Sequence, residues 1–333
     1  MASQNQTRLA SLFASAPPSS HPSTWDSLWR TPTFLPWDRG SSSPALIDLL
    51  NIRDRPSTSP DPNPTPAAPP PNSSSLGYAS LPPPRRKNGT RSRVLIPGCG
   101  RGYDVALFAA HGYDAYGLEV SAHAARAARE WLEDPGQGPL EGEYKVFDQE
   151  GREKKGDWGK MVVLEGDYFE ESWVGGVEGW ERDGGGFDVV LDYTFLCALP
   201  PELRSKWAKR TARLLREHDT KADPESDTRH DDGVLICIEF PTHKPANSGG
   251  PPWACPPTVH AELLKRPGEE ITYDENGVVV ATDRPEAENA LVKIAHYTPR
   301  RTHTVGVIDG IVRDCVSMWR LKSHVSERER FHA

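Results

Sequence analysis

The sequence predicts an α/β fold in which helices cover both faces of a mainly parallel sheet. The first observation is that short, continuously apolar segments alternate with amphipathic segments from Arg93 onward. Strands buried on both faces of a parallel sheet have this appearance. The second observation is a glycine-rich turn at residues 98–102, directly after an apolar run. The third is an acidic residue, Glu119, at the end of the next apolar run, as in many open parallel sheets.

The chain before the sheet divides into three parts. Residues 1–20 contain only a broken apolar run, and we expect a disordered terminus there. Residues 21–51 hold three tryptophans and end in an expected short helix at 44–50, whose first turn Pro44 suits. Residues 56–84 are dominated by Pro, Ser and Asn, which cannot bury enough apolar surface to fold. We therefore expect a disordered insertion over 56–84.

We expect a single domain over residues 21–333, with the sheet formed after the insertion. The expected strands are short apolar runs at 94–96, 115–119, 161–164, 187–191 and 234–240, followed by late strands within 305–321. The expected helices lie at 103–111, 121–133 and 201–216, and the polar segment 217–232 is expected to be a loop.

Composition limits the class of partner. The formal net charge of −8 argues against a nucleic-acid substrate. No stretch approaches the roughly 20 apolar residues that cross a bilayer, so we expect no membrane partner. The five cysteines are widely separated and form no CxxC pair, which argues against a disulfide framework or a metal site. A reducing, cytoplasmic location and a monomer are the simplest expectations.

The glycine turn is the strongest local motif. It places Gly98, Gly100 and Gly102 at alternate positions after a strand, so the backbone can turn sharply and approach a ligand. Glu119 follows about twenty residues later, where a carboxylate can accept hydrogen bonds from ribose hydroxyls. Alternatively, Glu119 is a favourable charge at the start of the following helix. Together the two features favour a nucleoside-bearing cofactor without separating S-adenosylmethionine from NAD.

Two further features have a binding and a structural interpretation. Asp167 and Tyr168 follow the third strand, where an acid and an aromatic ring can flank an adenine, or where they form a polar turn with a packed ring. Trp25 and Trp29 are four residues apart, so a helix would place both rings on one face. Such rings can attract a cation by about 0.5–2 kcal/mol, or they can pack the helix onto the sheet.

Six segments, in order along the chain, together resemble the plant and fungal thiol/halide methyltransferases. That family belongs with the thiopurine methyltransferases among the class I methyltransferases. The matching segments are Trp25–Trp29, Pro36–Asp38, Leu95–Asp104, Gly117–Ser121, Phe187–Ala198 and Ser248–Pro252. The resemblance runs from residue 25 to about residue 253, and the insertion and the last eighty residues lie outside it.

The resemblance implies a Rossmann-like, doubly wound sheet of seven strands, with S-adenosyl-L-methionine as the methyl donor and a small thiol, bisulfide or halide as the acceptor. It assigns cofactor contacts to the following residues: Trp25, Trp29 and Trp37 as a cover, Gly98 through its backbone, Glu119 on the ribose, Asp167 and Tyr168 on the adenine, and Tyr193 beside the cofactor. The family usually has aspartate in place of Glu119 and tyrosine in place of Trp253. The second difference removes a phenol from the expected acceptor pocket.

Methyl transfer from a sulfonium to a thiolate or halide needs alignment and a dry site more than a strong base. Asp192 and Tyr193 lie at the carboxyl end of a strand, where open α/β sheets bind ligands. We expect Tyr193 to orient the acceptor or the methyl group. Asp192 would hold the cofactor's amino-acid end or the loop, or would simply cap a turn. Residues 241–257 would form a lid that places Trp253 over the acceptor, or a rigid surface loop.

Two other classes of protein share part of this pattern. A nicotinamide-dependent oxidoreductase also has a strand, a glycine turn and an acid, although its glycine spacing is usually wider. A cofactor-binding module that has lost catalysis and serves as a partner protein would keep the same motifs. An S-adenosylmethionine-dependent methyltransferase remains the principal prediction.

Overall fold

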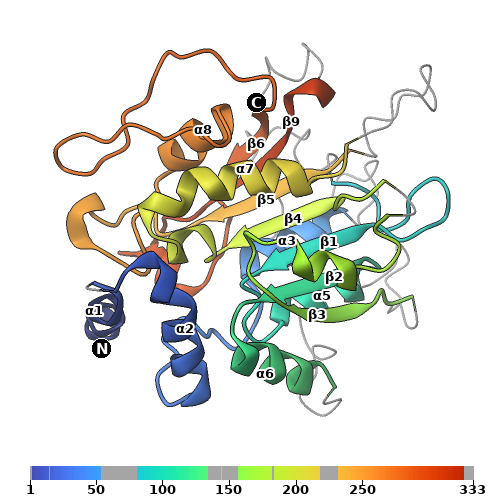
Figure 1. Cartoon of the computed structure of the whole chain (residues 1–333), viewed down its shortest axis with the longest axis horizontal. Helices are drawn as coiled ribbons and strands as arrows, with labels where there is room; N and C mark the ends of the chain where they lie inside the picture. The colour runs from blue at the N-terminus through green and yellow to red at the C-terminus, as the bar shows by residue number, and fades with distance from the viewer. Residues whose placement is uncertain are drawn as a thin grey trace.

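The computed structural model describes residues 2–14, 16–53, 81–133, 144, 157–181, 184–217 and 232–325. A seven-stranded sheet with the order β3-β2-β1-β4-β5-β9-β6 runs through its centre (Figure 1). The strands are β1 Arg93–Pro97, β2 Asp114–Glu119, β3 Met161–Glu165, β4 Val189–Tyr193, β5 Val234–Glu239, β6 Leu291–Tyr297 and β9 Cys315–Leu321.

Strands β1 to β5 are all parallel to one another, whereas β9 pairs antiparallel with both β5 and β6. The strand order reverses between β1 and β4, and open α/β sheets bind their ligands outside the carboxyl ends of the strands at such a point. The predicted fold class, a doubly wound and mainly parallel seven-stranded sheet, is confirmed.

Helices cover both faces of the sheet, because alternate strand residues point to opposite sides. In β5, Val234 and Ile236 belong to the apolar core shared with α3 (Pro44–Arg53) and α5 (Tyr103–Ala110). Leu235 belongs to the core on the opposite face, which includes side chains from the helices α7 (Arg204–Leu214) and α8 (Pro257–Lys265). Helix α6 (Ala122–Glu133) packs beside β2 and β3.

Strand positions agree with the sequence prediction to within two residues up to β5, but two later elements were not predicted. Strand β6 and helix α8 lie between the predicted fifth strand and the predicted late strands. The late region itself forms β9 and a small hairpin of β7 (Val307–Ile308) and β8 (Ile311–Val312). The expected loop at 217–232 lies almost wholly outside the described residues.

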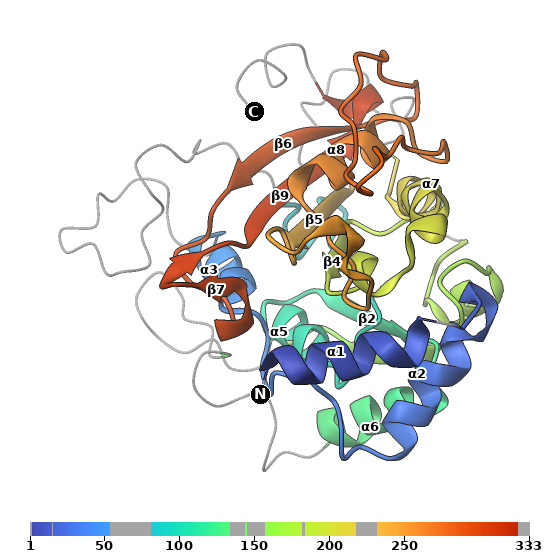
Figure 2. The ribbon, with the colours of Figure 1, turned by 90° about the vertical axis from the view of Figure 1, so that its left-hand side faces the viewer.

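The N-terminus differs from the expected disordered segment. Helix α1 (Ala2–Phe13) lies against α2 (His21–Arg30), which in turn lies beside α6 (Figure 2). Leu9 and Phe13, four residues apart, are both buried, and the Phe13 ring lies 4.7 Å from that of Trp25. This short apolar stripe is enough to order α1, because α2 offers an aromatic surface against which the stripe packs.

Most of the expected insertion, residues 56–80, lies outside the described residues. Its last residues belong to the fold, since Leu81 is buried and the Tyr113 hydroxyl donates a hydrogen bond to the Pro82 carbonyl at 2.8 Å. Among the described helices, none is both long enough and apolar enough to cross a membrane.

A buried carboxylate joins several segments at the amino end of β4. Asp188 is 1% exposed and accepts the backbone N–H of Arg93 at 2.7 Å. It also accepts Nε of Arg86 at 2.9 Å and Nε of Arg216 at 3.2 Å. Asp188 therefore ties the segment before β1 and the segment after α7 to the sheet.

We expect Asp188→Ala to lower the free energy of unfolding by about 3–5 kcal/mol, because it removes a buried anion that pairs with two largely buried guanidinium groups. Asp157→Ala is the matched control: Asp157 pairs with Arg85 and Arg91, but its side chain is 68% exposed. That control should lose about 1 kcal/mol or less. Urea denaturation of both variants measures the difference, and equal losses would contradict the assignment.

Candidate active site

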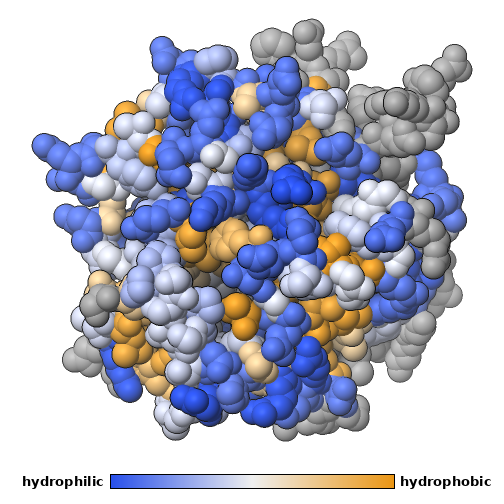
Figure 3. Space-filling model, in the orientation of Figure 1, coloured by the Kyte–Doolittle hydropathy of each residue, from blue (hydrophilic) through white to orange (hydrophobic). Residues whose placement is uncertain are grey.

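A cavity of about 620 Å³ opens at the carboxyl ends of β1, β2 and β4, where the strand order reverses. On the face shown in Figure 3, hydrophobic residues form several patches, some of them near the centre, with hydrophilic residues between them. Most of the cofactor-contacting residues predicted from the sequence line the cavity. They are Trp25, Trp29, Trp37, Gly98, Gly100, Glu119, Asp167 and Tyr168.

The glycine turn forms part of the cavity wall. Gly98 has a φ of 62°, and a side chain there would begin 2.7 Å from the Phe195 ring. Gly100 has a φ of 54°, and a Cβ there would lie 3.5 Å from the Trp29 ring. Both positions therefore need glycine for backbone conformation, and Gly98 also needs it for space. This close approach of the backbone leaves room for a ligand beside the turn.

Glu119 lies at the end of β2 and faces the same cavity. One carboxylate oxygen accepts the Gly100 N–H at 3.1 Å, and the other accepts the N–H groups of Val120 at 3.0 Å and Ser121 at 3.3 Å. Burial raises the pKa of Glu119 to about 7, although these three donors oppose the rise. The carboxylate thus accepts hydrogen bonds at the start of α6, as the helix-start interpretation expects, and it also borders the cavity.

The three tryptophans of the N-terminal segment line the cavity as one aromatic cluster. The Trp37 ring lies 5.0 Å from that of Trp25 and 6.1 Å from that of Trp29, both edge to face. The Arg101 guanidinium lies over the Trp29 ring at 5.7 Å. These rings pack against one another, as the packing interpretation expects, and they also line the cavity.

Two aspartates that sequence reasoning did not single out anchor this segment. Asp26 accepts the Ser121 hydroxyl at 2.7 Å and lies 2.9 Å from Nδ1 of His123, at the start of α6. Asp38 accepts Nε of Arg101 at 2.6 Å and the Tyr103 hydroxyl at 2.9 Å, on the glycine turn. Each aspartate directly follows a cavity tryptophan in the sequence, and that repeated Trp-Asp pair was the available signal.

The expected adenine-contacting pair lines the cavity after β3. Oδ1 of Asp167 accepts the Phe169 N–H at 2.9 Å. The Tyr168 hydroxyl forms a 2.7 Å hydrogen bond with Thr211 in the core, and its ring lies edge to face with Phe195 at 5.1 Å. Tyr168 therefore offers the cavity a fixed aromatic ring, not a free phenol.

The three residues for which we expected a catalytic role do not line the cavity. Asp192 is buried and accepts the Leu196 N–H at 3.1 Å and the indole N–H of Trp207 at 2.9 Å. Burial raises the pKa of Asp192 to about 7. These contacts match the turn-cap interpretation, because the carboxylate holds the loop after β4.

Tyr193 points to the other side of β4 from Asp192, as successive strand residues do. Its ring stacks on that of His303 at 6.1 Å, and its hydroxyl has no hydrogen-bond partner among the described residues. Thr194 then adopts a φ of 62° and, with Phe195, lines the cavity instead. The left-handed turn at Thr194 thus shifts the cavity lining from Tyr193 to the two residues after it, which no sequence spacing revealed.

Trp253 lies just behind the cavity wall. Pro251 and Pro252 line the cavity, whereas the Trp253 ring stacks on His21 of α2 at 6.0 Å. The Trp253 N–H donates to the carbonyl of Cys197 at 2.7 Å. The proline-rich segment thus contacts both the N-terminal segment and the loop after β4. Lys206 and Arg39 also line the cavity and were not predicted, because neither lies in a recognised motif.

The reversed strand order, the glycine turn after β1 and the buried carboxylate at the end of β2 are the arrangement of a class I S-adenosylmethionine-dependent methyltransferase. The model of the thiopurine S-methyltransferase (TPMT) family matches residues 84–292, which is more than half of the chain. The chain belongs to this family, and S-adenosylmethionine is its cofactor.

Similar proteins agree with this assignment. Thiocyanate methyltransferase 1 of Brassica oleracea is 26% identical over 259 residues, covering 78% of this chain and 79% of that protein. A probable thiol methyltransferase 2 of Arabidopsis thaliana is 27% identical over 258 residues, covering 77% and 78%. Thiopurine S-methyltransferase of Stutzerimonas stutzeri is 32% identical over 126 residues, covering 38% and 46%.

We expect Asp26→Ala and Asp38→Ala each to weaken binding of S-adenosylhomocysteine by on the order of tenfold. Each change removes charge-assisted hydrogen bonds that hold the aromatic cover, and such bonds contribute about 1.5–3 kcal/mol. Isothermal titration measures the dissociation constant. Asp48→Ala is the control, since Asp48 pairs with Arg301 and does not line the cavity. Unchanged affinity in both cover variants would show that the aspartates do not position the site.

Proposed function

We propose that this protein transfers the methyl group of S-adenosylmethionine to a small, soft nucleophile: a thiol, bisulfide, thiocyanate or halide. The observation that carries the proposal is the composition of one cavity. Its cofactor side has Glu119 and the glycine turn, and its remaining wall is mainly apolar and aromatic. Relatives named for thiocyanate and thiol methylation support the same class of acceptor.

The residues of the cavity fit the cofactor. Glu119 would accept hydrogen bonds from the ribose hydroxyls, and Gly98 and Gly100 would let the backbone approach it. Asp167 and Tyr168 would contact the adenine. The tryptophans of the N-terminal segment would lie near the positive sulfur, where their faces are favourable, and would exclude water. S-adenosylmethionine would supply a methyl group bonded to a positively charged sulfur, and the neutral thioether S-adenosylhomocysteine would be the leaving group.

The acceptor side of the cavity suits a nucleophile that needs no strong base. Leu9, Pro22 and Leu203 line it, and among the described lining residues His21 is the one imidazole. Nε2 of His21 lies 3.2 Å from the Ala16 carbonyl oxygen, so this nitrogen is hydrogen-bonded to the backbone. Lys206 adds a positive charge, which favours an anionic acceptor. A thiolate or halide is already nucleophilic, and the protein's task is to align it in a dry site.

The proposal also includes a cellular location and an oligomeric state. A cytoplasmic location is supported by the five cysteines, all of which are free. A monomer is supported by the cavity, since one chain supplies its glycine turn, its acid and its aromatic cover.

We expect cofactor binding to tighten as the pH rises through about 7. Burial raises the pKa of Glu119 to about 7, and its ionised form is the better acceptor for two ribose hydroxyls. Between pH 8 and pH 6 the dissociation constant for S-adenosylhomocysteine should rise by up to about tenfold. Glu119→Gln should bind more weakly and with little pH dependence. A wild-type protein whose affinity follows the variant's flat profile would contradict a role for this carboxylate.

The proposed reaction is tested by incubating the protein with methyl-labelled S-adenosylmethionine and a panel of thiols, bisulfide, thiocyanate and halides. We expect labelled methyl thioether, methyl thiocyanate or methyl halide, with turnover reduced in Glu119→Gln. Cofactor binding without transfer to any panel member would overturn the proposed acceptor class and leave the family assignment intact.

A further inference from the structure

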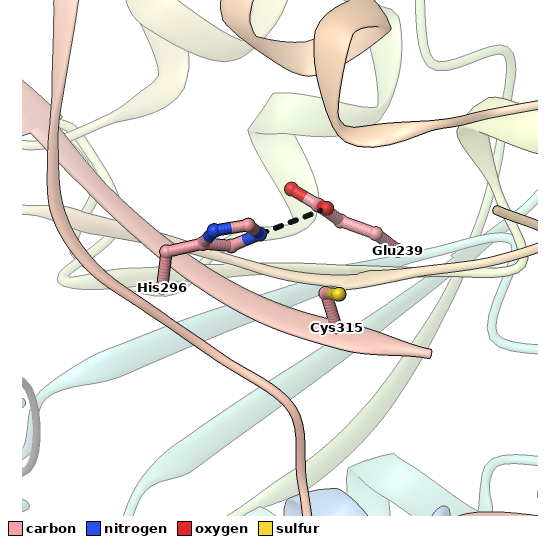
Figure 4. Close-up of side chains that lie close together, drawn as sticks. All are labelled: Glu239, His296 and Cys315. Carbon is pink, nitrogen blue, oxygen red and sulfur yellow. Dashed lines mark hydrogen bonds and ion pairs between the residues drawn. The ribbon is translucent and has the colours of Figure 1, made fainter. Parts of the chain in front are cut away.

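A second group of reactive side chains lies where strands β5, β9 and β6 are neighbours. Glu239 ends β5, Cys315 begins β9 directly opposite it, and His296 belongs to β6 on the far side of β9. A carboxylate oxygen, a ring nitrogen and the Cys315 Sγ all lie within 4.8 Å of one another. Figure 4 shows the three side chains converging, with Glu239 and His296 joined by a 3.4 Å contact.

We propose that Glu239, His296 and Cys315 form a binding site for a divalent transition-metal ion of the zinc type. Thiolate, imidazole and carboxylate are the three ligand types that zinc prefers in proteins. In a tetrahedral zinc site the sulfur and nitrogen ligands are about 3.5 Å apart, as their bond lengths to the metal require. Because the three ligand atoms already lie within 4.8 Å of one another, side-chain adjustments of about 1 Å or less would bring them to this spacing.

The surroundings of Glu239 are those of an oriented ligand. Glu239 is 1% exposed, and one carboxylate oxygen accepts the Ser317 hydroxyl at 2.6 Å. Ser317 in turn accepts the indole N–H of Trp319 at 2.8 Å. Such outer hydrogen bonds fix the ligand's direction in metal sites. Ser317, itself oriented by Trp319, thus holds one carboxylate oxygen of Glu239, and the other oxygen faces His296.

Charge and access also suit a cation. Glu239 supplies a buried carboxylate whose second oxygen lies 3.4 Å from Nε2 of His296, so a negative group already faces the place where the ion would bind. Nδ1 of the buried His260 lies 3.8 Å from Glu239, on the carboxylate oxygen that accepts the Ser317 hydroxyl. His296 is exposed, so an ion can enter from solvent, and water can complete the coordination.

The site would have a structural role beside the active site. Phe240, which follows Glu239, lines the cofactor cavity. Pro241 accepts the N–H of Cys255, at the end of the proline-rich segment, at 2.9 Å. An ion bound by Glu239, His296 and Cys315 would fix the ends of three strands directly behind this wall.

The test uses the tag-free full chain, freed of metal with a chelator and titrated with Co²⁺ as the probe. We expect one Co²⁺ per chain, with a near-ultraviolet absorption band from thiolate-to-cobalt charge transfer, and displacement by Zn²⁺. Zn²⁺ should also raise the Tm. Folded wild-type protein that binds no Co²⁺, or binds it without the thiolate band, would overturn the proposal.

Cys315→Ser should abolish the band and the Zn²⁺-dependent rise in Tm. Cys99→Ser is the matched control, because Cys99 is the other cysteine that is not fully buried, and it should keep both signals. If Cys315→Ser does not fold, His296→Ala replaces it, because His296 is exposed and its loss should leave the fold intact. This variant should bind Co²⁺ at least tenfold more weakly than the wild type. A thiolate band that persists in Cys315→Ser would contradict the assigned ligand.

Discussion

The hydrogen bonds between Glu119 and the glycine turn are the interaction on which the site depends. The carboxylate at the end of β2 accepts the N–H of Gly100 after β1 and two N–H groups at the start of α6. One buried side chain therefore fixes two adjacent strand ends and a helix start. Because it also borders the cavity, the same group that organises the turn is available to the cofactor. A residue with this double task cannot be replaced without altering both.

The aromatic cluster of Trp25, Trp29 and Trp37 is held by the same two elements, the glycine turn and the start of α6. Asp26 binds the start of α6, and Asp38 binds the glycine turn, so the aromatic cluster is anchored on either side of Glu119. Burial alone would raise the pKa of Asp26, but the hydrogen bonds from His123 and Ser121 hold that pKa below its usual range. The anchor therefore stays ionised at neutral pH. The aromatic cluster, the glycine turn and Glu119 are therefore connected by hydrogen bonds, although their residues are far apart in the sequence.

The sequence was sufficient for features that are local. Periodicity predicted the strands to β5, and the glycine turn with Glu119 predicted where the cavity lies. It was insufficient where distant segments meet. Leu9 and Phe13 order the N-terminus only because α2 is there to bury them. Tyr193 was expected beside the cofactor, but the left-handed Thr194 brings Phe195 to the cavity instead. The cluster of Glu239, His296 and Cys315 has no sequence spacing at all, because three strands bring it together.

Hydrogen–deuterium exchange with and without S-adenosylhomocysteine tests the central claim most directly, which is that cover, turn and Glu119 form one cofactor site. The account predicts slower exchange in three separate segments together: residues 21–38, 98–103 and 119–123. Residues around β6 and β9 should change little. Protection confined to one of the three segments, or found only elsewhere in the chain, would contradict it.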